Sequence, residues 1–78
     1  MLPDRRNQVR VRANFDGEVE VKVRPGQRVS RGTALVVVEG DAQIETLSAR
    51  GDATVVSVEV ADGAEVRSTA LLVVLQED

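Results

Sequence analysis

"GEVEVKVRPGQRVSRGTALVV", residues 17–37, decides the fold, because the chain repeats this pattern 37 residues later as "TVVSVEVADGAEVRSTALLVV", residues 54–74. Both copies fit the form V-x-V-x-V-x-x-G-x-x-V-x-x-[GT]-x-x-L-V-V, so their apolar positions and turn positions coincide. Two copies are too few for a solenoid, which needs at least three repeats to be stable. The sequence therefore predicts a duplicated sheet unit whose two copies pack face to face.

Each copy begins with a strand in which valine alternates with other, mostly polar residues, the period of a half-buried strand. We expect the alternating valines to point inward; they are Val19, Val21, Val23, Val56, Val58 and Val60. Pro25-Gly26 and Asp62-Gly63 follow these strands, and both pairs suit tight turns, because glycine accepts a positive φ. The pattern predicts an all-β domain of two small antiparallel sheets in a flattened barrel or sandwich.

The amino-acid composition excludes several kinds of catalytic and binding site. The 78 residues include no cysteine and no histidine, so the usual nucleophiles, general bases and metal ligands are missing. Phe15 is the only aromatic residue, which excludes base stacking as a main binding mode. The longest apolar run, residues 71–75, is too short to cross a bilayer. We expect a cytoplasmic protein that is not an enzyme, with no metal site and no nucleic-acid or membrane partner.

The first dozen residues form a candidate basic arm, with four arginines against a single aspartate. The arginines are Arg5, Arg6, Arg10 and Arg12. Such an arm could bind phosphate or an acidic partner surface. The other interpretation is a solvated edge strand, because charged side chains protect an exposed edge from pairing with other chains.

The repeat and the segment between its copies resemble the biotinyl/lipoyl carrier domain family. The resemblance is carried by "GQRVSRGTAL", "GAEVRSTALL" and, between them, "VEGDAQIETLSA", and extends from about residue 9 to residue 75. Lipoyl domains of 2-oxoacid dehydrogenase acyltransferase subunits show V-E-[GST]-D-K-A in the middle segment, which "VEGD" matches more closely than the E-A-M-K-M of biotinyl domains. The resemblance implies an eight-stranded antiparallel barrel-sandwich of two four-stranded sheets with approximate two-fold symmetry. It also implies a modified lysine at the tip of the hairpin that joins the halves.

The chain departs from the family at that lysine, because the matching position holds Ala42. An alanine side chain has no amine and cannot form the amide that attaches lipoate or biotin. Lys22 is the only lysine, and its place in the middle of a predicted strand is unlike an exposed turn. Two smaller departures, Ala53 and Thr69, stand where the family has glycine in turns.

These observations predict a single domain, residues 1–78, with a first repeat over about 9–40, a hairpin tip at 39–42 and a second repeat over about 43–75. We expect no prosthetic group and a role in protein–protein binding or scaffolding, with the partner contacted by the tip or by the basic arm. The candidate recognition tip comprises Glu39, Gly40, Asp41, Ala42 and Glu45. The alternative is a genuine lipoyl or biotinyl carrier of a multienzyme complex whose lysine at position 42 was lost or mutated. A third interpretation, a membrane-fusion adaptor fragment, is disfavoured because a tight turn joins the two halves without an insertion.

Overall fold

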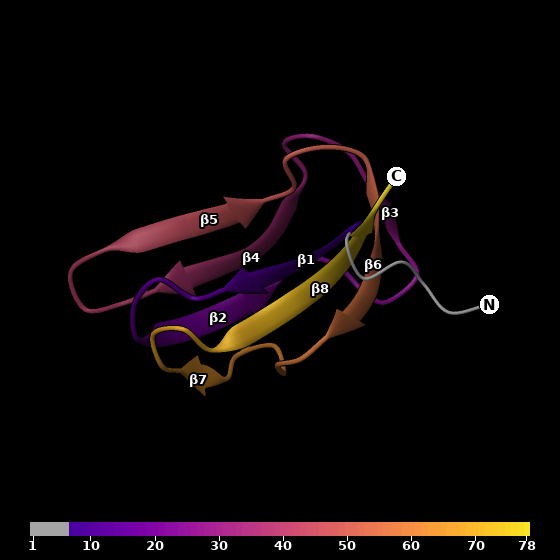
Figure 1. Ribbon diagram of the computed structural model, residues 1–78. Helices are drawn as coiled ribbons and strands as arrows, with labels where there is room; N and C mark the ends of the chain where they lie inside the picture. The colour runs from indigo at the N-terminus through magenta and orange to yellow at the C-terminus, as the bar shows by residue number, and fades with distance from the viewer. Residues whose placement is uncertain (1–6) are drawn as a thin grey trace.

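The computed structural model describes residues 7–78, which form eight strands in two four-stranded antiparallel sheets (Figure 1). One sheet has the order β1-β8-β6-β3 and the other β5-β4-β2-β7. The strands are β1 Gln8–Arg12, β2 Gly17–Val21, β3 Arg28–Val29, β4 Ala34–Glu39, β5 Ile44–Ser48, β6 Ala53–Val58, β7 Glu65–Val66 and β8 Leu71–Glu77. The all-β fold expected from the sequence is confirmed.

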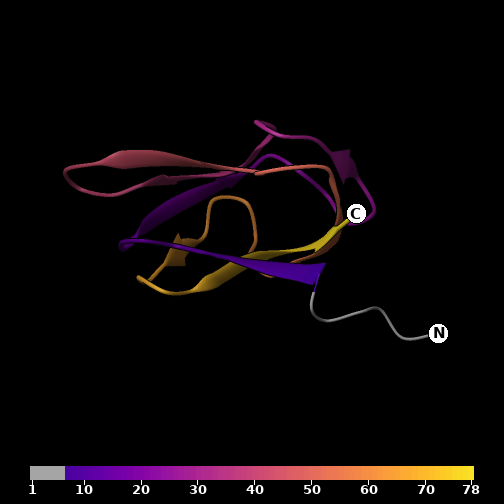
Figure 2. The same cartoon turned by 45° about the horizontal axis from the view of Figure 1, so that its top comes forward.

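The two sheets are counterparts of each other. A shift of about 37 residues places β2 on β6, β3 on β7 and β4 on β8, and β1 corresponds in the same way to β5. Each strand therefore has its counterpart at the equivalent position of the opposite sheet. Figure 2 shows the two layers edge-on, with the β4–β5 hairpin extending at the end opposite the C-terminus. The pseudo-two-fold arrangement follows directly from the sequence repeat.

Four tight turns repeat the same geometry at matching positions of the two halves. In each, the third residue has a positive φ, which glycine adopts without a steric penalty. These residues are Gly26 (φ 87°), Gly32 (φ 90°), Gly63 (φ 85°) and Thr69 (φ 74°). The turn at Pro25-Gly26 closes with a hydrogen bond from the Gln27 N–H to the Arg24 carbonyl, as expected for type II. Thr69 thus forms the turn of its glycine counterpart despite being β-branched.

The core lies between the sheets and is built from the apolar runs of β4 and β8 with single valines from the other strands. Its most buried members are Leu35, Val36, Val38, Leu72 and Val73. No polar or charged residue is buried among those described. Leu35 and Leu72 occupy matching positions of the two repeats, so both halves contribute equivalent side chains to one core.

The prediction that Val56 points inward is wrong. Its side chain is 45% exposed, and Val55 is buried in its place. The reason is a bulge in β6: Val55 pairs with Leu75 but Ser57 pairs with Val74, which leaves Val56 as the extra residue. A bulge shifts which residues face the core on one side of it, and simple alternation cannot reveal it. The other five alternating valines are buried or half-buried.

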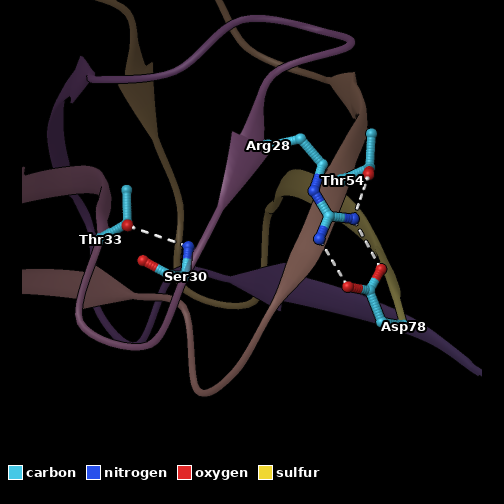
Figure 3. A network of polar contacts seen from close by, with 5 residues as sticks. All are labelled: Arg28, Ser30, Thr33, Thr54 and Asp78. Atoms are coloured by element: carbon cyan, nitrogen blue, oxygen red, sulfur yellow. Dashed lines mark hydrogen bonds and ion pairs between the residues drawn. The ribbon is translucent and has the colours of Figure 1, made fainter.

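At the end of the molecule opposite the hairpin, the short strand β3 is attached to the C-terminus by an ion pair. Arg28 donates two hydrogen bonds to the Asp78 carboxylate, at 2.7 and 2.6 Å, and a weaker one to the Thr54 hydroxyl at 3.3 Å (Figure 3). These bonds from Arg28 lower the pKa of Asp78 below its usual value. Both side chains are exposed, so the pair contributes modestly to stability.

Candidate functional site

The hairpin between β4 and β5 ends in a two-residue turn that projects from the body of the domain (Figure 1). The Gly40 N–H donates to the Gln43 carbonyl at 2.8 Å, so Asp41 and Ala42 occupy the centre of the turn. Both are exposed. The structure therefore places Ala42 where any partner that approaches this end of the molecule would meet it.

Close backbone contact holds the base of the hairpin against the start of β2. A Cβ atom on Gly17 would lie 2.5 Å from the Glu39 carbonyl oxygen, and one on Gly40 would lie 2.9 Å from the Asp16 carbonyl oxygen. Both distances are too short for a side chain, so glycine is required at both positions. The Gly40 Cβ would also meet the ring of Phe15. The base of the hairpin is therefore packed closely against the start of β2.

Glu45 differs from the other acids predicted at the tip. Its Oε1 accepts a hydrogen bond from the Asn14 side-chain amide at 2.7 Å, and Glu45 is half-buried. This bond joins β5 to the loop between β1 and β2 beside the base of the hairpin. Glu45 is thus bonded to a neighbouring loop, whereas the side chains of Glu39 and Asp41 are exposed and make no such bond within residues 7–78.

The sheet adds two acids that the sequence analysis missed. Glu18 pairs directly with Glu39 on one side and with Glu65 on the other, so three glutamates form one row across β4, β2 and β7. Like charges directly opposite each other are destabilising, so this row lowers the stability of the free domain. The three glutamates are neighbours because of the register between strands. Their spacing along the chain does not indicate that they lie together.

The glutamate row borders a groove of about 620 Å³ that reaches the hairpin tip. Its lining includes Asp16, Asp41 and the three glutamates of the row, with Arg67 as the only basic residue. Ile44, directly opposite Glu39, is 65% exposed and places an apolar side chain beside the acids. The tip and the adjacent sheet face thus combine negative charge with one exposed aliphatic group.

Lys22 lies far from the tip. Its backbone N–H donates to the Leu35 carbonyl, five residues before Gly40. At about 3.3 Å per strand residue, that places it roughly 16 Å along the sheet from the turn. Its ammonium group pairs with Glu20 at 3.1 Å, as expected for a solvated charge partner.

The part of the predicted basic arm that the structure describes, Arg10 and Arg12, does not line the acidic groove at the tip. Arg5 and Arg6 lie outside the described residues. Arg10 and Arg12 belong to the edge strand β1, where Arg12 donates to the Thr69 carbonyl at 3.0 Å. The tip and the described part of the arm are therefore separate surfaces.

Within residues 7–78, no cluster of three or more carboxylates is arranged to hold a metal ion. The same residues contain no helix long and apolar enough to span a membrane.

Comparison with known proteins identifies the fold and the family. A family model described as "Biotin-requiring enzyme" (biotin/lipoyl) matches residues 9–75. The lipoyl domain of the 2-oxoglutarate dehydrogenase complex from Azotobacter vinelandii superposes with a TM-score of 0.72 at 26% identity, covering 90% of this chain and 95% of that one. A single-chain, multi-domain long-chain acyl-CoA carboxylase superposes with a TM-score of 0.83 at 24% identity, covering all of this chain but only 8% of the carboxylase. No curated protein sequence matches the chain.

Proposed function

Because the chain belongs to the biotin/lipoyl attachment domain family, whose carrier domains are non-catalytic parts of enzyme complexes, we propose that it is a carrier fold that acts as a protein-binding module without a prosthetic group. The partner is a protein, contacted through the hairpin tip formed by Glu39, Asp41 and Ala42. Fold alone does not fix function, so the proposal rests on the residues of the tip.

The observation that carries the proposal is the methyl side chain of Ala42 at the exposed centre of the turn. The residues present do not fit lipoate or biotin, because attachment needs a primary amine there. Neither Asp41 nor Gln43 provides one. Lys22 has an amine, but it is held against Glu20 on a sheet face roughly 16 Å from the turn.

The surroundings of the tip support a role in binding. The row of three glutamates retains like charges at directly opposite positions, an arrangement that costs stability in the free domain. A cationic partner surface would remove this repulsion. Ile44 would add apolar contact at the edge of the acidic face, since it is 65% exposed in the free chain.

Intact mass spectrometry tests the absence of the prosthetic group. The protein is incubated with lipoate ligase or biotin ligase, their substrates and ATP, beside the variant Ala42→Lys. We expect the wild-type mass to equal that of the bare chain, and the variant to gain one lipoyl or biotinyl group, since the turn geometry is preserved. Modification of the wild type, which could occur only at Lys22 or the N-terminus, would refute the proposal. The same refutation follows if protein from its natural source carries a lysine at position 42 and a cofactor.

Partner capture tests the binding role. The wild type and Asp41→Lys are immobilised and compared for the proteins that each retains from an extract of the source cells. Glu59→Lys is the matched control, because Glu59 is an exposed acid outside the tip and its groove. We expect a protein retained by the wild type and the control to be lost with Asp41→Lys. Retention that is equal for all three would exclude the tip as the binding surface.

A further inference from the structure

A second groove, of about 570 Å³, lies on another side of the molecule, between the edge strands β1 and β5 of the two sheets. Its apolar lining comes from both sheets: Val9, Val11, Leu47, Ala53 and Leu75. Asn14 and Glu45, whose side chains bond across the same pair of edges, lie near one end. The groove is therefore the open side of the sandwich, where the two sheets are not joined by a ladder.

The charge of this groove is opposite to that of the tip. Arg10, Arg12 and Arg50 line it, against the single acid Glu77. None of the three arginines forms an ion pair with another described residue; Arg12 contacts only the neutral Thr69 carbonyl. Three guanidinium groups without an ion-pair partner among residues 7–78, around an apolar floor, favour a ligand that carries both carboxylates and aliphatic groups.

The edge of β5 that borders the groove offers free backbone hydrogen-bonding groups. The Gly40–Gln43 hydrogen bond fixes the alternation of the β4–β5 ladder, so Glu45 and Leu47 direct their backbone groups to β4. Ile44, Thr46 and Ser48 consequently direct theirs away from β4, and no described strand pairs with them.

This edge also lacks the usual protection against strand addition. The other long edge strand, β1, carries Arg10 and Arg12, and the remaining edges, β3 and β7, are only two residues long. By contrast β5, "IETLS", has five residues, no lysine, arginine or proline, and its one charged side chain is bonded to Asn14. An edge with these properties is a template for an added strand.

We propose that the β1–β5 groove binds an extended acidic segment of another protein, which adds to β5 as an antiparallel or parallel strand. Its backbone pairs with Ile44, Thr46 and Ser48, its aliphatic side chains contact Leu47 and the groove floor, and its carboxylates pair with the arginines. This is strand addition with charge-based selection. Single-stranded nucleic acid fits less well, because the groove contains no aromatic side chain for base stacking.

Fluorescence anisotropy at pH 7.5 and low salt tests the proposal with a labelled eight-residue peptide of alternating valine and glutamate, capped at both ends. We expect saturable binding of this peptide and none of the matched valine–lysine peptide. Arg50→Glu should weaken binding at least tenfold, and Arg50→Lys should largely retain it. Arg24→Glu is the control, since Arg24 has the same charge and is exposed in a turn outside the groove.

Two further peptides separate strand addition from simple charge attraction without altering the protein. One is N-methylated at its valines and the other at its glutamates. Only alternate amides of a strand face one edge, so one of the two peptides should lose binding at least tenfold while the other retains it. Equal affinity of both would overturn strand addition.

Three other results would overturn the assignment. The first is absence of binding at millimolar peptide with a folded wild type. The second is a single-stranded oligonucleotide that competes for the groove with higher affinity than the peptide. The third is self-association of the protein through β5, detected by sedimentation equilibrium and abolished by Thr46→Lys, which would assign the edge to a second copy of this chain.

Discussion

Replacement of Thr69 by glycine should stabilise the protein. Thr69 is exposed and adopts φ 74°, in the left-handed region where a Cβ atom collides with the backbone. Its counterpart in the first repeat, Gly32, adopts φ 90° in the same turn. The left-handed conformation costs an L-residue about 1–2 kcal/mol. Glycine avoids this cost but loses more backbone entropy on folding, about 0.5–1 kcal/mol.

The net gain expected for Thr69→Gly therefore lies within about 0–1.5 kcal/mol, and the midpoints of the two ranges give about 0.75 kcal/mol. The contacts made by Thr69 belong to its backbone: its N–H donates to the Ala13 carbonyl at 2.8 Å, and its carbonyl accepts from Arg12 at 3.0 Å. Glycine keeps both. For a domain of this size the midpoint gain corresponds to a rise in Tm of roughly 3–6 °C.

Differential scanning calorimetry at pH 7 measures the change in Tm. The converse variant, Gly32→Thr, should lower Tm by a similar amount, because a Cβ at that position meets no atom and only the φ penalty acts. Thr46→Gly is the control, since Thr46 is an exposed strand residue without a positive φ, and glycine there should lower Tm. An unchanged or lower Tm for Thr69→Gly would refute the argument from backbone strain.

Three further predictions concern packing and charge. Gly17→Ala should destabilise the domain by about 1–3 kcal/mol in urea denaturation, because its Cβ would collide with the main chain of β4. Gly51→Ala is the control and should have little effect, because no atom of the described residues lies within contact distance of a Cβ at that position. Val55→Thr should lower the free energy of unfolding by about 1–3 kcal/mol, because it buries a hydroxyl group. Val56→Thr should change it by no more than about 0.5 kcal/mol, because Val56 is exposed. Equal losses of stability for the two variants would contradict the bulge in β6. Asp78→Asn should lower Tm at pH 7, and the difference from wild type should vanish as the pH falls well below 3.8, because a lowered carboxylate pKa contributes stability that protonation removes. A difference that persists at pH 2 would show that the ion pair is not its cause.

Much of the fold could be predicted because the sequence contains an internal repeat, which indicates two equivalent halves. The 37-residue repeat aligns four turns and three pairs of strands, and the alternating valines identify the inner face of β2 directly. Thr69 shows how strongly the whole fold determines a local conformation, since the turn forms even where glycine is absent.

What the sequence could not predict depends on register between strands. The bulge that exposes Val56 exists only in the pairing of β6 with β8, and the row of Glu18, Glu39 and Glu65 exists only in the pairing of β2 with its two neighbours. The bond between Glu45 and Asn14 joins residues that are 31 positions apart, so the sequence did not indicate it; Glu45 as a recognition residue stays a prediction. The sequence likewise did not show that the edges of β1 and β5 face each other across a groove that Arg50 also lines.

The contacts that hold the hairpin do not depend on the side chain at position 42. The tip is held by the close approach of Gly17 and Gly40 to neighbouring backbone and by the bond between Asn14 and Glu45. None of these contacts involves the side chain of residue 42, which is exposed at the centre of the turn. Replacement of an exposed side chain that makes no contact is energetically almost neutral, so the shape of the tip is independent of the residue at position 42. The proposed function needs this independence, because a tip that keeps its shape with alanine at position 42 can present the same surface to a protein partner.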